Sequence, residues 1–239
     1  MMQQLLLELA PAPAPTLENF FPGPNEAALA ALRDALAGEE RIVYVRGETG
    51  SGKTHLLRAA ANHIEALGGS AHYVSAPHAD LASDRGEHED LGAAKRMKNP
   101  LECDLLAVDD LERLDTESQR ALFDTINARR SGGGRLLGAG TPPAVDLPLR
   151  EDLRTRLGSG LSLRLLPLED EQKTAALTWH AARRGLRLAP EIVSYLLTHC
   201  RRDMGTQVAV LDALDRHSLE RKRPVTLPLL RDALRALER

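Results

Sequence analysis

The stretch GETGSGKTHLL at residues 47–57 is the part of the sequence that decides the fold. A glycine, four residues and then Gly-Lys-Thr form the pattern of a phosphate-binding loop. The preceding RIVYVRG at residues 41–47 has the apolar character of a buried strand, and residues 54–67 are spaced as a helix. Because the motif requires a strand before it and a helix after it, this context favours a nucleotide site over a chance match.

Each residue type in this loop has a chemical reason to be there. Glycines let backbone N–H groups converge on a β-phosphate at the positive end of a helix. Lys53 supplies a positive charge to the β- and γ-phosphates, and the Thr54 hydroxyl is a ligand for Mg²⁺. The predicted nucleotide-binding residues of the loop are Gly47, Glu48, Thr49, Gly50, Ser51, Gly52, Lys53 and Thr54.

Two carboxylates, Asp109 and Asp110, end the apolar run LLAVDD at residues 105–110. In nucleotide hydrolases one carboxylate after such a strand holds the water shell of Mg²⁺, and the next can orient an attacking water. We therefore expect Asp109 on the metal side of the site and Asp110 in the catalytic role. A turn or helix cap is the structural alternative for Asp110.

Apolar runs alternate with helical segments over the first two thirds of the chain. Unbroken apolar strands separated by helices predict an α/β fold with a parallel sheet covered on both faces. Residues 76–100 are polar and acidic, then helical in character, and look like an excursion from this sheet. The five predicted strands are residues 41–47, 70–75, 103–111, 135–141 and 160–166.

Strand signals end at Pro167, after which only helices are predicted. We therefore divide the chain into residues 1–15, 16–166 and 167–239: a flexible peptide with a Pro/Ala linker, the nucleotide-binding α/β part, and a small α-helical lid. The stiff spacer is APAPAP at residues 10–15, where each proline restricts its own φ and the residue before it. The predicted lid helices are residues 169–184, 190–200, 205–221 and 226–237.

Helix starts are predicted from capping residues. Asn25 is a plausible N-cap for a helix that ends at Gly38. Thr116 and Gln119 have the spacing of a capping box for a helix reaching residue 130. The residues of that helix expected to face inward are Leu122, Thr125 and Ile126.

Composition narrows the class of protein. Of 239 residues, 31 are Lys or Arg and 34 are Asp or Glu, so the net charge of −3 argues against a protein that mainly coats duplex DNA.

Cys103 and Cys200 are far apart and lack metal-ligand neighbours, so we expect two reduced core thiols. The start has no signal-peptide pattern, and no run approaches the roughly 18 apolar residues of a membrane span. A cytoplasmic protein with no membrane partner is expected.

The motifs together resemble the AAA+ module of the bacterial replication initiator DnaA. The resemblance rests on GETGSGKTHLL, DLLAVDDLERL and LRTRLGSGL in this order and spacing, and on the leader TLENFFPGPNEAAL at residues 16–29. It covers the chain from about Thr16 onward and implies a P-loop AAA+ fold with a five-stranded sheet and a helical lid. It also implies ADP or ATP as cofactor, with Mg²⁺, and places Asn25 near the adenine pocket.

Two differences from an initiator favour the Hda family, the DnaA-homologous regulators that inactivate the initiator. An initiator has a folded N-terminal domain, whereas only fifteen residues precede the module here. An initiator carries a helix-turn-helix domain that reads DNA, whereas here Arg239 follows the predicted lid, so no sequence-specific DNA binding is expected. The family docks on the DNA polymerase sliding clamp through an N-terminal Gln-Leu-x-Leu-Pro peptide. Glu8 stands where that pattern has proline, and the alternative is a terminus that is disordered or folds onto its own domain. The matching clamp-binding residues are Gln4, Leu5, Leu7 and Leu9.

The resemblance also assigns Arg156 as an arginine finger offered in trans to a partner's ATP. Arg150 and Arg154 are the alternatives nearby. Thr141 stands at the sensor position where the initiator usually has Asp, and its hydroxyl can still bond a γ-phosphate or a water. Gly205 falls where the initiator has its lid arginine, which weakens the expectation that this chain hydrolyses ATP efficiently itself.

Three functions remain open from the sequence. The favoured one is a negative regulator of replication initiation that, with the sliding clamp, stimulates ATP hydrolysis by DnaA. The second is an autonomous AAA+ ATPase of the DnaA or helicase-loader type, acting in its own oligomer. A small-molecule kinase is a remote third, because no acceptor site is visible.

Overall fold

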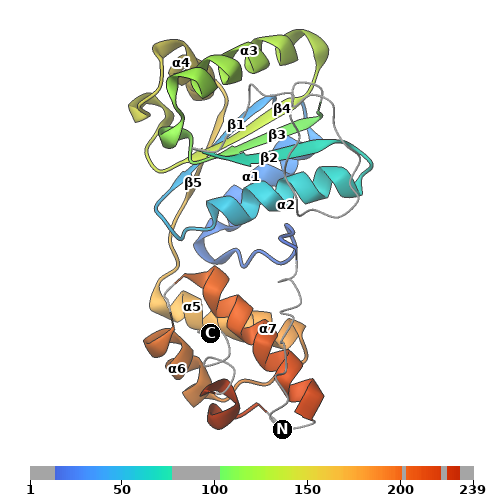
Figure 1. The fold of residues 1–239 in the computed structure, drawn as a ribbon, viewed down its shortest axis with the longest axis vertical. Helices are drawn as coiled ribbons and strands as arrows, with labels where there is room; N and C mark the ends of the chain where they lie inside the picture. The colour runs from blue at the N-terminus through green and yellow to red at the C-terminus, as the bar shows by residue number, and fades with distance from the viewer. Residues whose placement is uncertain (1–13, 77–102, 201–202, 222–224, 232–239) are drawn as a thin grey trace, which may run out of the picture. The chain divides into compact units, whose positions relative to one another are not determined.

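The computed structural model describes residues 14–76, 103–200, 203–221 and 225–231 (Figure 1). The chain divides into two compact units. One comprises Pro15–Pro167 and contains the sheet, and the other contains the helices that follow Leu168. The predicted excursion at residues 76–100 falls almost wholly outside the described residues.

The sheet has five parallel strands, which confirms the predicted fold class. The strand order is β2-β3-β4-β1-β5, so the phosphate loop follows a strand inside the sheet rather than at its edge. The strands are β1 (Ile42–Gly47), β2 (Ala71–Ser75), β3 (Leu105–Asp109), β4 (Arg135–Gly140) and β5 (Leu161–Leu165).

Helices cover the sheet on both faces (Figure 1). On one face α1 (Glu26–Ala37) and α2 (Lys53–Ala66) share an apolar core with alternate residues of the strands. On the other face α3 (Thr116–Gly132) and α4 (Glu151–Gly158) share a second core. Burial on both sides is why the inner strands β3 and β4 are apolar runs, whereas the edge strand β5 alternates, with Ser162 and Arg164 exposed.

The predicted cap of α3 was wrong by one residue. Asp115 is the N-cap, and its carboxylate accepts a hydrogen bond from Ser118 N at 2.7 Å. The predicted box partner, Gln119, instead donates to the carbonyl of Leu114. Carboxylate and hydroxyl both cap helices well, so two adjacent candidates are not distinguished by sequence. The three inward residues of α3 are buried as predicted: Leu122, Thr125 and Ile126.

The lid unit is built from α5 (Asp170–Arg183), α6 (Pro190–His199) and α7 (Met204–Arg221), which enclose their own apolar core. A fourth helical segment is described only at residues 227–231. Arg184 and Asp212 form a largely buried ion pair at 2.6 Å between the C-terminal end of α5 and α7. Neither Cys103 nor Cys200 forms a disulfide with a described residue; Cys103 is buried, as predicted, whereas Cys200 is half-buried.

Candidate functional site

The loop between β1 and α2 has the backbone shape that its glycines predict. Gly50 and Gly52 have φ values of 84° and 100°, a region that favours glycine, and Lys53 begins α2 directly afterwards. A Cβ on Gly52 would also lie 2.7 Å from the ring of Phe20, so the leader segment packs onto the loop through this glycine. The positive φ values of Gly50 and Gly52 thus let the chain turn tightly between the end of β1 and the start of α2.

Lys53 is held inside the loop. Its side chain is buried, and Nζ donates to the carbonyl oxygens of Gly47 at 2.7 Å and Glu48 at 3.1 Å. Ser51 is also buried, and its Oγ has no hydrogen-bond partner within the described part of the chain. A held ammonium and an unsatisfied hydroxyl at the start of a helix are donors suited to phosphate oxygens.

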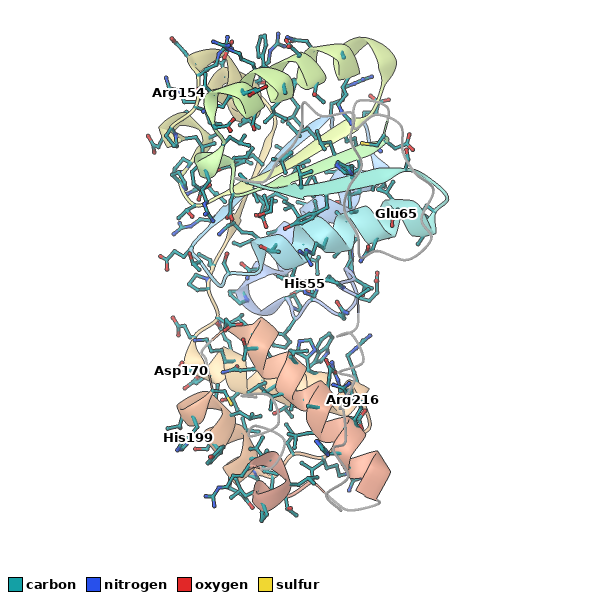
Figure 2. All side chains as sticks on the ribbon, in the orientation of Figure 1. His55, Glu65, Arg154, Asp170, His199 and Arg216 are labelled. Carbon is teal, nitrogen blue, oxygen red and sulfur yellow. The ribbon has the colours of Figure 1, made fainter. Side chains whose placement is uncertain are left out.

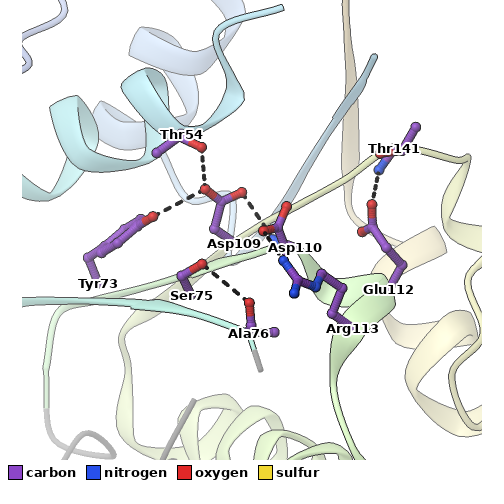
Figure 3. A network of polar contacts seen from close by, with 9 residues as sticks. All are labelled: Thr54, Tyr73, Ser75, Ala76, Asp109, Asp110, Glu112, Arg113 and Thr141. Carbon is purple, nitrogen blue, oxygen red and sulfur yellow. Dashed lines mark hydrogen bonds and ion pairs between the residues drawn. The ribbon is translucent and has the colours of Figure 1, made fainter. Parts of the chain in front are cut away.

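Asp109 receives three hydrogen bonds at the carboxyl end of β3 (Figure 3). Oδ2 accepts from Thr54 Oγ1 at 2.5 Å and from Tyr73 OH at 3.2 Å. Oδ1 accepts from the backbone N of Asp110 at 3.0 Å. The structure therefore brings together Thr54 and Asp109, the two residues predicted on the metal side.

Asp110 adopts a left-handed conformation, with φ 53° and ψ 46°, which is uncommon outside glycine, asparagine and aspartate. Its carboxylate lies 3.7 Å from the guanidinium of Arg113. Burial raises the pKa of Asp110, and the nearby carboxylates of Asp109 and Glu112 raise it further. The catalytic role expected of Asp110 stays a prediction.

Thr141 comes directly after β4, as predicted for a sensor residue. Its backbone N donates to Glu112 Oε1 at 3.0 Å, which ties the end of β4 to the segment after β3 (Figure 3). The other carboxylate oxygen of Glu112 is buried and has no hydrogen bond to any described residue. The sequence did not single out Glu112, because its partner is a backbone group 29 residues away.

Asn25 is the N-cap residue of α1, as predicted, but its side chain makes no capping hydrogen bond. The buried amide instead pairs with the peptide of Leu166: Nδ2 donates to the carbonyl at 2.9 Å, and Oδ1 accepts from N at 2.7 Å. The residue ties the leader to the chain after β5. Its predicted contact with a nucleotide stays a prediction.

His55 attaches the leader to α2 beside the loop (Figure 2). Its Nε2 lies 3.1 Å from the carbonyl of Thr16, and its ring centroid is 5.6 Å from that of Phe20. A carbonyl only accepts, so Nε2 carries the hydrogen of this contact. Burial lowers the pKa of His55, which keeps the ring neutral in its apolar setting.

Arg156 lies on α4, on the opposite face of the sheet from α2 and its loop; Figure 2 labels Arg154 on the same helix. The side chain of Arg156 is half-buried, and no ion pair joins it to another described residue. Arg150, by contrast, is paired with Asp152 at 2.7 Å. Arg156 lines an open hollow of about 880 Å³ together with Phe123, Arg150, Glu151, Asp152, Thr155 and Ser159.

The remaining predicted residues are those of the N-terminal peptide and Gly205 of the lid. Gln4, Leu5, Leu7 and Leu9 are outside the described residues. Gly205 lies in the first turn of α7, where an added Cβ would come no closer than 3.5 Å to Asp203. Packing therefore does not require glycine at this position, and a larger side chain would fit.

The parallel sheet, the phosphate loop between β1 and α2, and a separate helical unit define an AAA+ module. Residues 12–164 match the family of the bacterial DnaA ATPase domain, and residues 170–234 match the Hda lid domain. The chain therefore belongs to the DnaA-related AAA+ family and carries a lid of the Hda type.

Several individual proteins are similar to this chain. An uncharacterized protein of Haemophilus influenzae is 33% identical over 240 residues, covering 98% of this chain and 99% of that protein. A replication initiator DnaA bound to AMPPCP and single-stranded DNA has a TM-score of 0.65 at 25% identity, over 87% of this chain and 67% of that one. Domain III of DnaA from Thermotoga maritima shares the fold, with a TM-score of 0.66 at 20% identity, over 92% and 95%.

No helix in the described ranges is both long and apolar enough to span a membrane.

Proposed function

We propose that this chain is a regulator of replication initiation that binds an adenine nucleotide and lends Arg156 to ATP held by the initiator DnaA. Stimulated hydrolysis would convert the initiator to its ADP form and repress further initiation. The proposal draws on the DnaA-type ATPase domain and Hda-type lid of the chain, and on the position of Arg156. The protein would act in the cytoplasm, as a monomer or in an oligomer of its own.

The residues of the loop fit ADP or ATP. Lys53 and the N–H groups at the start of α2 would bind the phosphates, and Thr54 and Asp109 would hold Mg²⁺ directly and through water. Nucleotide sites hold Mg²⁺ with one or two protein oxygens plus phosphate oxygens, and the Thr54 hydroxyl and the Asp109 carboxylate, 2.5 Å apart, supply such oxygens. When bound, the metal would neutralise phosphate charge.

The observation that carries the proposal is the position of Arg156. A side chain on α4 is separated by the sheet from the loop at α2, so it is poorly placed to serve its own phosphate site. A half-buried guanidinium without an ion pair among the described residues, at the rim of an open hollow, is available to an anion on another molecule. A triphosphate held by a neighbouring AAA+ subunit has that charge.

The N-terminal peptide would bring the regulator to its target. Gln4 would hydrogen-bond and Leu5, Leu7 and Leu9 would fill an apolar groove on the sliding clamp, as an extended peptide does in its receptor. The polymerase clamp would then hold the regulator near DNA-bound initiator. Substituting Gln4→Ala together with Leu7→Ala should abolish retention on immobilised clamp, and retention at the wild-type level would remove the peptide from the proposal.

The test is ATP hydrolysis by purified DnaA in the presence of clamp, DNA and this protein. Arg156→Ala should reduce the stimulated rate by about 10³-fold, or to the basal rate of the initiator, since an arginine finger contributes about 10³–10⁵ in rate. Arg154→Ala, two residues away on the same helix, is the matched control and should retain stimulation. Stimulation that survives Arg156→Ala would refute the assignment of the finger.

A second function is favoured by one observation: the hydrogen-bonded set of Thr54, Asp109 and Asp110 that hydrolysis in cis would need. On that alternative the chain is an autonomous ATPase, and the purified protein alone should turn over ATP. Asp110→Asn should then abolish turnover. We favour the regulator because Gly205 leaves the lid without the arginine expected of an initiator.

A further inference from the structure

Among the described residues, Tyr73 is the one donor to Asp109 that belongs to neither nucleotide motif. The other two donors, Thr54 and the backbone of Asp110, lie in the phosphate loop and directly after β3. Tyr73 lies on β2, and its phenol reaches the same carboxylate oxygen as Thr54 (Figure 3).

The register of the sheet explains this contact. β2 and β3 are parallel neighbours, with Tyr73 opposite Ala107 and Ser75 opposite Asp109. Residues two apart on a strand share a face, so Ala107 and Asp109 both face the layer of α2. Tyr73 packs on the same core, and its long side chain extends along the sheet to reach Asp109.

The guanidinium group of Arg58, on α2, lies over the face of the Tyr73 ring. Its guanidinium carbon is 4.7 Å from the ring centroid, which is cation–π distance. A carboxylate only accepts hydrogen bonds, so the Tyr73 phenol is the donor in its contact with Asp109.

We propose that Tyr73 is a positioning residue for the metal of the bound nucleotide: it orients the Asp109 carboxylate, and Arg58 holds Tyr73 in place. Thr54 and Tyr73 both donate to Oδ2, so Tyr73 would keep that oxygen oriented when the Thr54 hydroxyl turns to a metal. Groups that orient the ligands of a metal contribute to its affinity without touching it. This inference rests on the proposed nucleotide site.

The experiment measures metal and nucleotide separately on the full chain. Mn²⁺, as a spectroscopic substitute for Mg²⁺, is titrated into protein saturated with ADP, and free Mn²⁺ is followed by EPR. ADP affinity is measured in EDTA by calorimetry. Tyr73→Phe should weaken Mn²⁺ binding by about 10-fold, the lower end for residues that support metal ligands, while ADP affinity in EDTA stays within about twofold.

Tyr44→Phe is the matched control. Tyr44 is a fully buried tyrosine on β1 whose OH donates to the carbonyl of Pro142 at 2.7 Å, in the core on the other face of the sheet. It should leave Mn²⁺ affinity unchanged. Arg58→Gln, at an exposed position, should give a smaller loss in the same direction, and it tests the claim if Tyr73→Phe does not fold.

If Tyr73→Phe binds Mn²⁺ as tightly as the wild-type protein does, the inference is overturned. An equal loss of ADP affinity in EDTA would also overturn it, because that pattern marks a structural role. If the wild-type protein binds ADP but no Mn²⁺, only the inference fails. If it binds no ADP at all, the proposed function fails with it.

Discussion

Single side chains in this protein join segments that are far apart in the chain. Asn25 is 2% exposed and satisfies both backbone groups of Leu166 from 141 residues away. A side-chain amide matches the donor and acceptor of a peptide, so one residue closes two hydrogen bonds at once. The contact fixes the leader against the chain that leaves β5.

Replacing Asn25 by alanine should therefore destabilise the protein measurably. Two partly buried backbone groups lose their partners, and we expect a fall in the free energy of unfolding of about 1–3 kcal/mol. Urea unfolding followed by circular dichroism measures it. Asn62→Ala is the control, because the Asn62 amide makes one bond, to the carbonyl of Pro15 at 2.8 Å, and should cost about 1 kcal/mol. Equal losses would contradict the two-bond account.

Among single residues, the sequence predicted those whose role follows from a short motif. Lys53 and Thr54 follow from the spacing of one motif, and Asp109 from its place after an apolar run. The contacts of Tyr73 with Asp109 and of Asn25 with Leu166 could not be predicted, because the partners lie 36 and 141 residues away in the chain. Tyrosine on a strand is also common for packing reasons alone, so its type gave no signal.

At the scale of elements, two glycines of β4 let the 3-10 turn η3 (Leu111–Arg113) lie close against the sheet. A Cβ on Gly138 would come within 2.7 Å of Leu111. A Cβ on Gly140 would meet Tyr44 OH at 2.5 Å and Glu112 Oε2 at 2.7 Å. The two glycines are two residues apart, so they open one face of one strand. That space is what allows Glu112 to reach the backbone of Thr141.

Gly140→Ala should disturb the packing of Tyr44 and Glu112 against the end of β4. Tyr44 is fully buried and bonded to Pro142, so its OH has little room to withdraw, and we expect a loss of about 1–3 kcal/mol in the free energy of unfolding. Gly158→Ala is the control, since a Cβ at Gly158 meets nothing within 4 Å. Chemical denaturation of both variants checks the prediction, which fails if the two behave alike.

Strands were easier to predict than caps. Each described strand lies inside a predicted strand segment, and the compositional signal is clearest for β3 and β4, which are buried almost throughout. The cap of α3 was displaced to Asp115, and the capping box that does form, with Glu169 and Gln172 at the start of α5, was not predicted. Several residue types cap a helix with similar free energies, so the choice depends on the entering chain.

At the scale of the molecule, the candidate phosphate site lies wholly within one of the two units. The sheet unit has a core on each face of the sheet, and the helical unit has a core of its own. The change from apolar strands to helices after Pro167 predicted this division of secondary structure. The sequence pattern could not indicate which buried polar pairs each unit contains, such as Arg184 with Asp212.

Nucleotide should stabilise the protein through that site. A ligand that binds only the folded state adds RT ln(1 + [L]/Kd), about 2.7 kcal/mol at a concentration 100 times Kd, so ADP with Mg²⁺ should raise the melting temperature in calorimetry. Lys53→Met removes the buried ammonium that the loop carbonyls hold and should abolish the increment. Lys173→Met, in the helical unit, removes only the surface pair with Asp170 and should keep it. An increment that persists in Lys53→Met would mean that nucleotide binds somewhere other than this loop.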